Sequence, residues 1–296
     1  MMKISTVKYG LLCVMAIAVS CGKASKILVE EEVIIDPIHT FFKGEVRPDK
    51  TKTCFNGAYY RKMVSSKDYW LGIGGKVTLP TITFDPLRIN PAKPGQFLDN
   101  PSVYIGGSMG GQETDIGLTW EVIRDGSGNV SADRRAFRPF MRRTSHSGGQ
   151  LALYENAPAV SDYYWYPGEE VEISVQLLTD KKIKFIVQGA GKRFEKEFDA
   201  DGYRPGVLGE FKRVNAIDQV ANEGKPVQTT RTKVENSQWT ETYLFRSFEG
   251  NVVKAPAHAG RLTDMRCPST TNFSITATDV AMNNGAEKIN ISGTGY

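Results

Sequence analysis

The amino-acid sequence predicts an all-β protein built as a two-sheet antiparallel β-sandwich. Short segments in which apolar and polar residues alternate recur along the chain, as expected of strands that bury one face. Clusters of Gly, Pro, Asn and Asp separate these segments, and the chain contains 29 Gly and 14 Pro. No long stretch shows the periodicity of an amphipathic helix. Many short strands joined by turns are typical of two packed antiparallel sheets.

The composition is that of an ordinary globular protein. Of the 296 residues, 40% are hydrophobic and 24% are charged, so the chain can bury a substantial core. It carries 37 Lys and Arg against 33 Asp and Glu, a formal net charge of +4. Because this charge is small, we expect no nucleic-acid partner.

The N-terminus predicts export. Lys3 and Lys8 precede an apolar stretch, Tyr9–Val19, which is too short to span a bilayer but suits a secretory signal. The stretch ends in Ala18-Val19-Ser20-Cys21, which resembles a bacterial lipobox. The resemblance implies that residues 1–20 are a lipoprotein signal peptide and that Cys21 carries a diacylglyceryl anchor with fatty acids such as palmitate. An ordinary signal peptide with an incidental Cys21 is the alternative.

The resemblance to lipoproteins also carries expectations about location and domains. Gly22 follows the cysteine where an Asp would favour the inner membrane, which implies an outer-membrane or cell-surface address. Residues 21–40 are then expected to form a lipidated tether, and residues 41–296 a single β-sandwich domain. The lipid anchor would be the membrane contact of the mature chain.

Two cysteines remain for a disulfide bond. Cys13 leaves with the signal peptide and Cys21 is lipidated, so Cys54 and Cys267 stay in an oxidising compartment. A bridge between them would close a very long loop, worth on the order of 5 kcal/mol in the loop-entropy model. Two buried free thiols are the alternative.

Individual strands can be predicted face by face. Along Glu113–Val122, the even-numbered residues form an apolar face and the odd-numbered ones a polar face. Val171–Leu177 alternates in the same way, and Thr179–Lys181 turns into Ile183–Gln188 as a hairpin. Further strands are expected at Tyr69–Leu79, Val103–Ile105, Arg193–Phe198, Glu210–Ile217, Gln228–Val234, Gln238–Arg246, Asn272–Ala277 and Lys288–Ser292.

The segment VYIGGSMGGQETDIGLTWEV at residues 103–122, within a chain of alternating strands, resembles the concanavalin A-like jelly rolls. These are the lectin and glucanase sandwiches, and their concave sheet binds glycans. The resemblance covers residues 40–296 at the level of architecture. It implies a jelly-roll sandwich with a polysaccharide as candidate ligand.

Three carboxylates on one strand face are the first candidate site. Glu113, Asp115 and Glu121 share the polar face, and neighbours two apart lie about 6.5–7 Å from each other. Glycosidases separate their two carboxylates by about 5–9.5 Å. One glucanase family on this fold would require a Glu at position 117 or 118, where Gly117 and Leu118 stand. A solvated face, hydroxyl binding and catalysis all stay open.

Arginines and aromatic residues are the second candidate set. Five arginines fall within Arg134–Arg143, and Arg138 could bind an acidic polysaccharide through bidentate contacts. A charged edge strand is the alternative. Trp165, in an aromatic run, and Trp239, near Glu241, could each offer a platform for a sugar ring. Packing in the core is the alternative for both.

Metal and cofactor sites are not expected, with one exception. The three histidines are scattered, which disfavours a zinc site or a Ser-His-Asp triad. A Ca²⁺ ion could be held by loop oxygens at Asp99 and Asn100 or at Asp125 and Asn129, although turn formation explains these residues equally well.

These observations favour a cell-surface lipoprotein that acts as a non-catalytic glycan-binding or adhesion module. The first alternative is a polysaccharide-degrading enzyme, a hydrolase or lyase, that uses the carboxylates of the strand Glu113–Val122. The second alternative is a structural or complex-forming surface lipoprotein without a small ligand.

Overall fold

A computed structural model describes residues 36–296, except residues 94, 122, 124–126, 128 and 130–135. The predicted signal peptide, Cys21 and most of the tether lie outside this range. The described part forms one compact unit that begins at Asp36. Its elements are β1 (Ala58–Val64), β2 (Trp70–Thr78), β3 (Thr81–Thr83), β4 (Asp99–Met109), β5 (Gln112–Glu121), β6 (Ala136–Arg143), β7 (Leu153–Asn156), η1 (Ser161–Tyr163), β8 (Glu170–Thr179), β9 (Lys182–Gly189), β10 (Lys192–Asp199), β11 (Gly209–Gln219), β12 (Lys233–Phe248), β13 (Asn251–Pro256), η2 (Ala259–Arg261), β14 (Met265–Cys267), η3 (Thr270–Asn272), β15 (Phe273–Thr276), α1 (Asp279–Asn283) and β16 (Glu287–Ser292).

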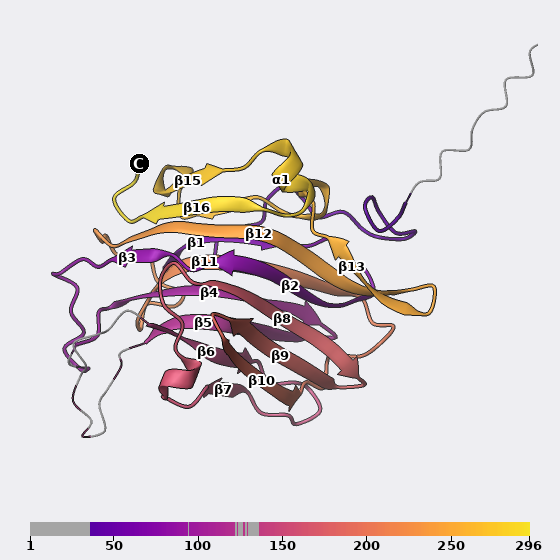
Figure 1. Cartoon of the computed structure of the whole chain (residues 1–296), viewed down its shortest axis with the longest axis horizontal. Helices are drawn as coiled ribbons and strands as arrows, with labels where there is room; N and C mark the ends of the chain where they lie inside the picture. The colour runs from indigo at the N-terminus through magenta and orange to yellow at the C-terminus, as the bar shows by residue number, and fades with distance from the viewer. Residues whose placement is uncertain (1–35, 94, 122, 124–126, 128, 130–135) are drawn as a thin grey trace, which may run out of the picture. The chain divides into compact units, whose positions relative to one another are not determined.

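The strands form two antiparallel sheets (Figure 1). A seven-stranded sheet has the order β14-β1-β11-β4-β5-β6-β7. A nine-stranded sheet has the order β10-β9-β8-β2-β12-β16-β15, and β3 and β13 also pair with β12. The predicted antiparallel sandwich is therefore confirmed, and its architecture is consistent with a concanavalin A-like jelly roll.

The alternation read from the sequence explains why these segments pair as they do. On β5, Ile116 and Leu118 are fully buried between the sheets, while Glu113 and Asp115 face outward. The predicted hairpin joins β8 and β9, and Lys181 adopts a φ of 61° in its turn. The strand expected at Gln228–Val234 begins only at Lys233, as part of β12.

The core fills the space between the sheets. It contains three fully buried tryptophans, Trp70, Trp165 and Trp239. A second, smaller apolar cluster lies on the outer face of the seven-stranded sheet, where β1, β11 and β14 meet; it comprises Ala58, Tyr60, Val64, Val214, Ala216, Met265 and Cys267. The outer face of this sheet is therefore partly covered.

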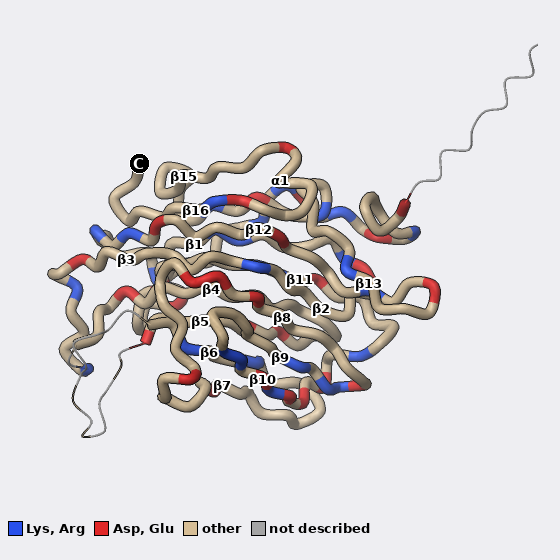
Figure 2. Tube along the Cα trace, in the orientation of Figure 1, with Lys and Arg blue, Asp and Glu red and all other residues tan. Residues whose placement is uncertain are grey.

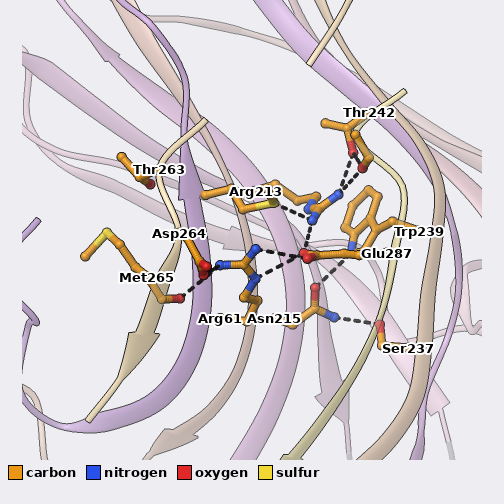
Figure 3. Close-up of polar contacts among 12 residues, drawn as sticks. Arg61, Arg213, Asn215, Ser237, Trp239, Thr242, Thr263, Asp264, Met265 and Glu287 are labelled. Atoms are coloured by element: carbon orange, nitrogen blue, oxygen red, sulfur yellow. Dashed lines mark hydrogen bonds and ion pairs between the residues drawn. The ribbon is translucent and has the colours of Figure 1, made fainter. Parts of the chain in front are cut away.

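A buried ionic cluster joins the two sheets (Figure 3). Glu287 on β16 accepts hydrogen bonds from Arg61 on β1, at 2.9 and 3.1 Å, and from Arg213 on β11. Arg213 also donates to Thr242 Oγ1, at 2.7 Å, and to the Gly285 carbonyl, at 2.6 Å. The exposed fraction is 1% for the Arg213 side chain and 5% for that of Glu287. Because β1 and β11 belong to one sheet and β16 to the other, these contacts cross the sandwich.

Cys54 and Cys267 form the predicted disulfide bond, with a sequence separation of 213 residues. Cys267 lies in β14, directly opposite Tyr60 of β1. The bond therefore fixes the segment before β1 to the edge of the seven-stranded sheet. Lys52, in the same segment, pairs through its ammonium group with Glu210 at 2.9 Å.

Acidic and basic residues are interspersed over the strands of both sheets (Figure 2). Within the described range, no helix has the length and apolar character needed to cross a bilayer.

Candidate functional site

A cavity of about 520 Å³ lies on the outer face of the seven-stranded sheet. We call it the groove. Strands β1, β4, β5, β6 and β11 supply its floor, and loops next to β1 and β11 supply further walls. Its lining residues are Phe55, Gly57, Ala58, Tyr60, Lys62, Tyr104, Glu113, Asp115, Arg142, Thr144, Lys212, Asp218, Gln219, Ala221 and Glu223.

Small residues help to make this face hollow. Gly117 of β5 stands in register between Tyr104 of β4 and Phe140 of β6. A Cβ atom at Gly117 would lie only 2.5 Å from the Tyr104 Cα, so glycine leaves the space that Tyr104 uses. The Tyr104 and Phe140 rings then meet edge to face, with centroids 5.8 Å apart.

A lysine and two carboxylates form the charged centre of the groove. Lys212, Gly106 and Asp115 stand opposite one another on β11, β4 and β5. Because Gly106 has no side chain, the Lys212 ammonium can reach across β4 to Asp115 Oδ1, at 2.5 Å, and it also pairs with Glu113. Burial raises the pKa of Glu113, but the charge and hydrogen bond of Lys212, together with the charges of Lys62 and Arg142, outweigh this effect and lower the pKa overall.

Two further cations line the groove. Arg142 of β6 pairs with Glu223, from the loop after β11, at 3.4 Å. Lys62 of β1 lies diagonally from Lys212, since Lys62 is opposite Val214 on the neighbouring strand. The groove therefore combines ammonium, guanidinium and carboxylate groups.

A fourth carboxyl group lies toward the other end of β11. Asp218 stands about 20 Å from Lys212 along the strand, at about 3.4 Å per residue. It accepts a hydrogen bond from Ser102 Oγ at 2.5 Å. Burial raises the pKa of Asp218 to about 6 despite this hydrogen bond. The groove thus holds one carboxyl group with a raised pKa and one, Glu113, with a lowered pKa.

Asp218 should make folding stability depend on pH. Its folded pKa of about 6 exceeds the value of about 3.9 for an unfolded aspartate, so the folded state binds this proton more tightly. The stabilisation is fully present below about pH 4 and is lost as the pH rises through about 6. We expect the stability of the wild type, relative to Asp218→Asn, to fall between these values. Urea unfolding of both proteins across that range measures the difference, and a flat difference would contradict the raised pKa.

The disulfide-linked segment forms one wall of the groove. Phe55, next to Cys54, has 55% of its surface exposed and contributes to the cavity lining. Its backbone N–H donates to the Tyr60 hydroxyl at 2.6 Å, and the Asn56 carbonyl accepts from the Gly224 N–H at 3.1 Å. We call residues 51–57 the strap. It presents an exposed aromatic ring to the same cavity that the charged centre lines.

The structure places the predicted carboxylates in two locations. Glu113 and Asp115 line the groove, as described above. Glu121 lies at the far end of β5, where it pairs with Arg138 at 2.8 Å, and neither residue lines the cavity. Arg138 also donates to the Ala157 carbonyl at 3.0 Å. Both side chains are thus engaged with each other, away from the groove.

The structure contradicts the prediction that Trp165 and Trp239 offer surface platforms for a sugar ring. Trp165 is completely buried between the sheets and donates its indole N–H to the Gly189 carbonyl at 3.0 Å. Trp239 is 1% exposed and donates to Asn215 Oδ1 at 2.8 Å. Both rings belong to the core because the sandwich needs large apolar side chains between its sheets. Neither ring can stack on a ligand at the surface.

The structure also differs from the two expectations for the segment Arg134–Arg143, a polysaccharide site at Arg138 or a charged edge strand. Arg134 and Arg135 lie outside the described residues. Strand β6 pairs with both β5 and β7, so it is not an edge strand. Arg143 donates to the backbone carbonyls of Asp199 and Leu151. Of the described arginines in this segment, Arg142 lines the groove.

Sequence reasoning missed Lys62, Lys212 and Asp218. Lys212 and Asp218 share the outer face of β11, but Arg213 on its inner face is also charged, which hides the alternation. On β1, Arg61 faces inward next to Lys62, so the sequence of β1 shows no alternation of charged and apolar residues either. The signal was present only as the spacing of Lys212 and Asp218 on one face.

Of the two loops predicted as candidate Ca²⁺ sites, the structure describes Asp99 and Asn100 but not Asp125. Asp99 accepts hydrogen bonds from Arg88 and from the hydroxyls of Thr230 and Thr232. Asp125 lies outside the described residues. Among the residues whose placement is described, no three His, Cys, Asp or Glu side chains gather as a metal-binding group.

Comparison with known proteins identifies no family for this chain. No family model matches the sequence, and no curated protein matches it. Among solved structures, the chain is similar to scytalido-glutamic peptidase with a transition state analog inhibitor; the identity is 9%, with 80% of this chain and 98% of that one covered, at a TM-score of 0.46.

Two glycan-active proteins are also similar in structure. The Bacteroides ovatus mixed linkage glucan GH16 protein is 12% identical, with 57% of this chain and 71% of that one covered, at a TM-score of 0.31. The kappa-carrageenase of Zobellia galactanivorans is 8% identical, with 80% and 65% covered, at a TM-score of 0.22. Likeness at this level concerns the fold, and no residue role is transferred from these proteins to this chain.

Proposed function

We propose that the groove binds a glycan without transforming it. The observation that carries this proposal is a balanced set of hydrogen-bond donors and acceptors around an open cavity. Lys62 and Lys212 offset the charges of Glu113 and Asp115, and Arg142 offsets Glu223. Sugar hydroxyls both donate and accept hydrogen bonds, so a mixed lining suits them.

The same balance of charge favours a neutral glycan over an acidic one. Four carboxyl groups line the groove, and three basic side chains stand against them. An anionic sugar would have to approach Asp218 and Glu223 as well as the cations. Phe55 adds an exposed ring against which the apolar face of a pyranose could pack. Export and anchorage through Cys21 would place this groove at the cell surface, and both are part of the proposal.

Affinity electrophoresis through gels that contain neutral or acidic polysaccharides tests the proposal. We expect retardation by a neutral polysaccharide, and about tenfold weaker binding by Phe55→Ala, which removes an aromatic contact worth about 1.4 kcal/mol. Tyr69→Ala is the matched control, because Tyr69 is 48% exposed and does not line the groove. Free migration of the protein in every gel would contradict glycan binding and would favour a structural role or a role in binding another protein.

A catalytic groove is the second candidate function, because two carboxylates that are neighbours on one strand face, Glu113 and Asp115, line the cavity. Such neighbours lie about 6.5–7 Å from each other, which is within the about 5–9.5 Å that separates the two carboxyl groups of a glycosidase. Under this alternative, Glu113 and Asp115 would be the catalytic pair. Release of reducing ends from a retained polysaccharide, abolished by Asp115→Asn, would favour the enzyme. Retention without release would favour the binding module.

A further inference from the structure

Lys62 differs from the other basic residues of the groove. Lys212 pairs with two carboxylates and Arg142 with Glu223. Among the described residues, the Lys62 side chain has neither a hydrogen bond nor an ion pair within bonding distance. It is partly buried on β1 and contributes directly to the cavity lining. Its amine is therefore held beside an open cavity without a hydrogen-bond or ion-pair partner from the described part of the chain.

We propose that Lys62 is a nucleophilic amine that forms a Schiff base with an aldehyde or ketone bound in the groove. The arrangement is one that activates lysine: a partly desolvated amine lies next to a second cation, Lys212. This reactivity does not depend on glycan binding, since any small carbonyl compound that enters the cavity could react.

The charges around Lys62 support this chemistry. Burial is the main cause that lowers the pKa of Lys62, and the Lys212 and Lys52 charges lower it further. Glu113 and Asp115 act in the opposite direction, but the pKa remains below its usual value. Each unit of lowering increases the fraction of neutral amine about tenfold at neutral pH.

The reaction balances without an oxidant or a reductant. The Lys62 nitrogen lone pair attacks the carbonyl carbon, and the carbonyl π electrons move to the oxygen, which takes up a proton. The nitrogen gives up a proton, so that a neutral carbinolamine forms. The carbinolamine oxygen then takes a second proton and leaves as water, while nitrogen and carbon form the C=N bond and nitrogen loses its remaining proton. Asp115 and Glu113 line the same cavity and could pass these protons through solvent.

Reductive trapping with glycolaldehyde and sodium cyanoborohydride tests the proposal on the full chain. Cyanoborohydride supplies a hydride that converts the imine to a stable secondary amine, and peptide mass spectrometry then locates it. At neutral pH and limiting aldehyde, we expect at least tenfold more adduct on Lys62 than on Lys76. Lys76 is the matched reference because it is exposed and its pairing with Glu241 raises its pKa. Comparable labelling of the two lysines would overturn the proposal.

Two variants separate reactivity from folding. Lys62→Arg keeps the positive charge but cannot form the imine, so the groove adduct should disappear while labelling of Lys76 is unchanged. Glu113→Gln removes a charge that raises the Lys62 pKa, so labelling of Lys62 should become faster. Slower or equal labelling in Glu113→Gln would contradict the electrostatic part of the argument. Lys62 labelling that persists in a chain that binds no glycan would overturn the proposed function alone.

Discussion

Replacing Glu287 by glutamine is expected to lower the free energy of unfolding by about 3–5 kcal/mol. Glu287 is the carboxylate shared by Arg61 and Arg213, and all three side chains are buried. Without its charge, Arg213 has no carboxylate partner among the described residues, and Arg61 keeps only the half-exposed Asp264. Unfolding in urea, followed by intrinsic tryptophan fluorescence, measures the loss.

Glu241→Gln provides the control for Glu287→Gln. Glu241 pairs with Lys76 at 3.2 Å at the surface, so its loss should cost less than about 1 kcal/mol. If Glu287→Gln does not fold, a triple change of Arg61, Arg213 and Glu287 to methionine should recover a folded chain, since apolar replacement removes all the buried charges. Equal losses for Glu287→Gln and Glu241→Gln would show that the buried cluster is energetically unimportant.

The pH dependence of this cluster has a definite sign. Burial raises the pKa of Glu287, but Arg213 and Arg61 outweigh it, so the folded pKa is lower than the unfolded one. The corresponding stabilisation is present above the unfolded pKa of about 4.3 and is lost as the pH falls through the folded value. Its direction is opposite to that of Asp218.

Removing the Cys54–Cys267 bond should have the second large effect, a loss of about 2–5 kcal/mol. The bond spans 213 residues, so it restricts the unfolded chain strongly, and in the folded chain it pins the strap to β14. The Cys54→Ser/Cys267→Ser variant should therefore unfold at lower urea concentration. Under the proposed function, this variant should also bind glycan more weakly, because Phe55 lines the cavity and follows the bonded Cys54 directly.

A matched comparison separates these two consequences of the disulfide. In the Phe55→Ala variant, binding should weaken while the disulfide contribution to stability stays intact, because Phe55 is largely exposed. The cysteine variant should lose both. Full affinity in the cysteine variant would show that the strap keeps its position without the disulfide bond, through the Phe55–Tyr60 and Asn56–Gly224 hydrogen bonds and the Lys52–Glu210 ion pair.

The fold could be predicted from the sequence because its signal is local. Alternation along β5 and β8 marks which side chains face the core, and the turn at Lys181 marks a hairpin. Strand β1 was missed because Arg61 lies inward beside Lys62 facing outward, so charge appears on both faces. An inward charge can be recognised only when its partner, Glu287, is known.

The site was predictable only in part, because its residues come from strands far apart in the sequence. Glu113 and Asp115 could be found on one strand face. Their partner Lys212 comes from β11, and the contact depends on the register that places Gly106 between the strands. Trp165 illustrates the opposite error, since composition cannot tell a core ring from a surface platform. Its burial follows from the pairing of Phe137 with Trp165.

The ends of the two sheets have a consequence for solubility. The outermost strands β14, β7 and β15 have three, four and four residues, and β10 carries the charged sequence KRFEKEFD. Short or charged borders offer little backbone to which another chain could add a strand. The disulfide bond also lies along the β14 border. Copies of this chain at high concentration should therefore stay separate instead of joining into continuous intermolecular sheets.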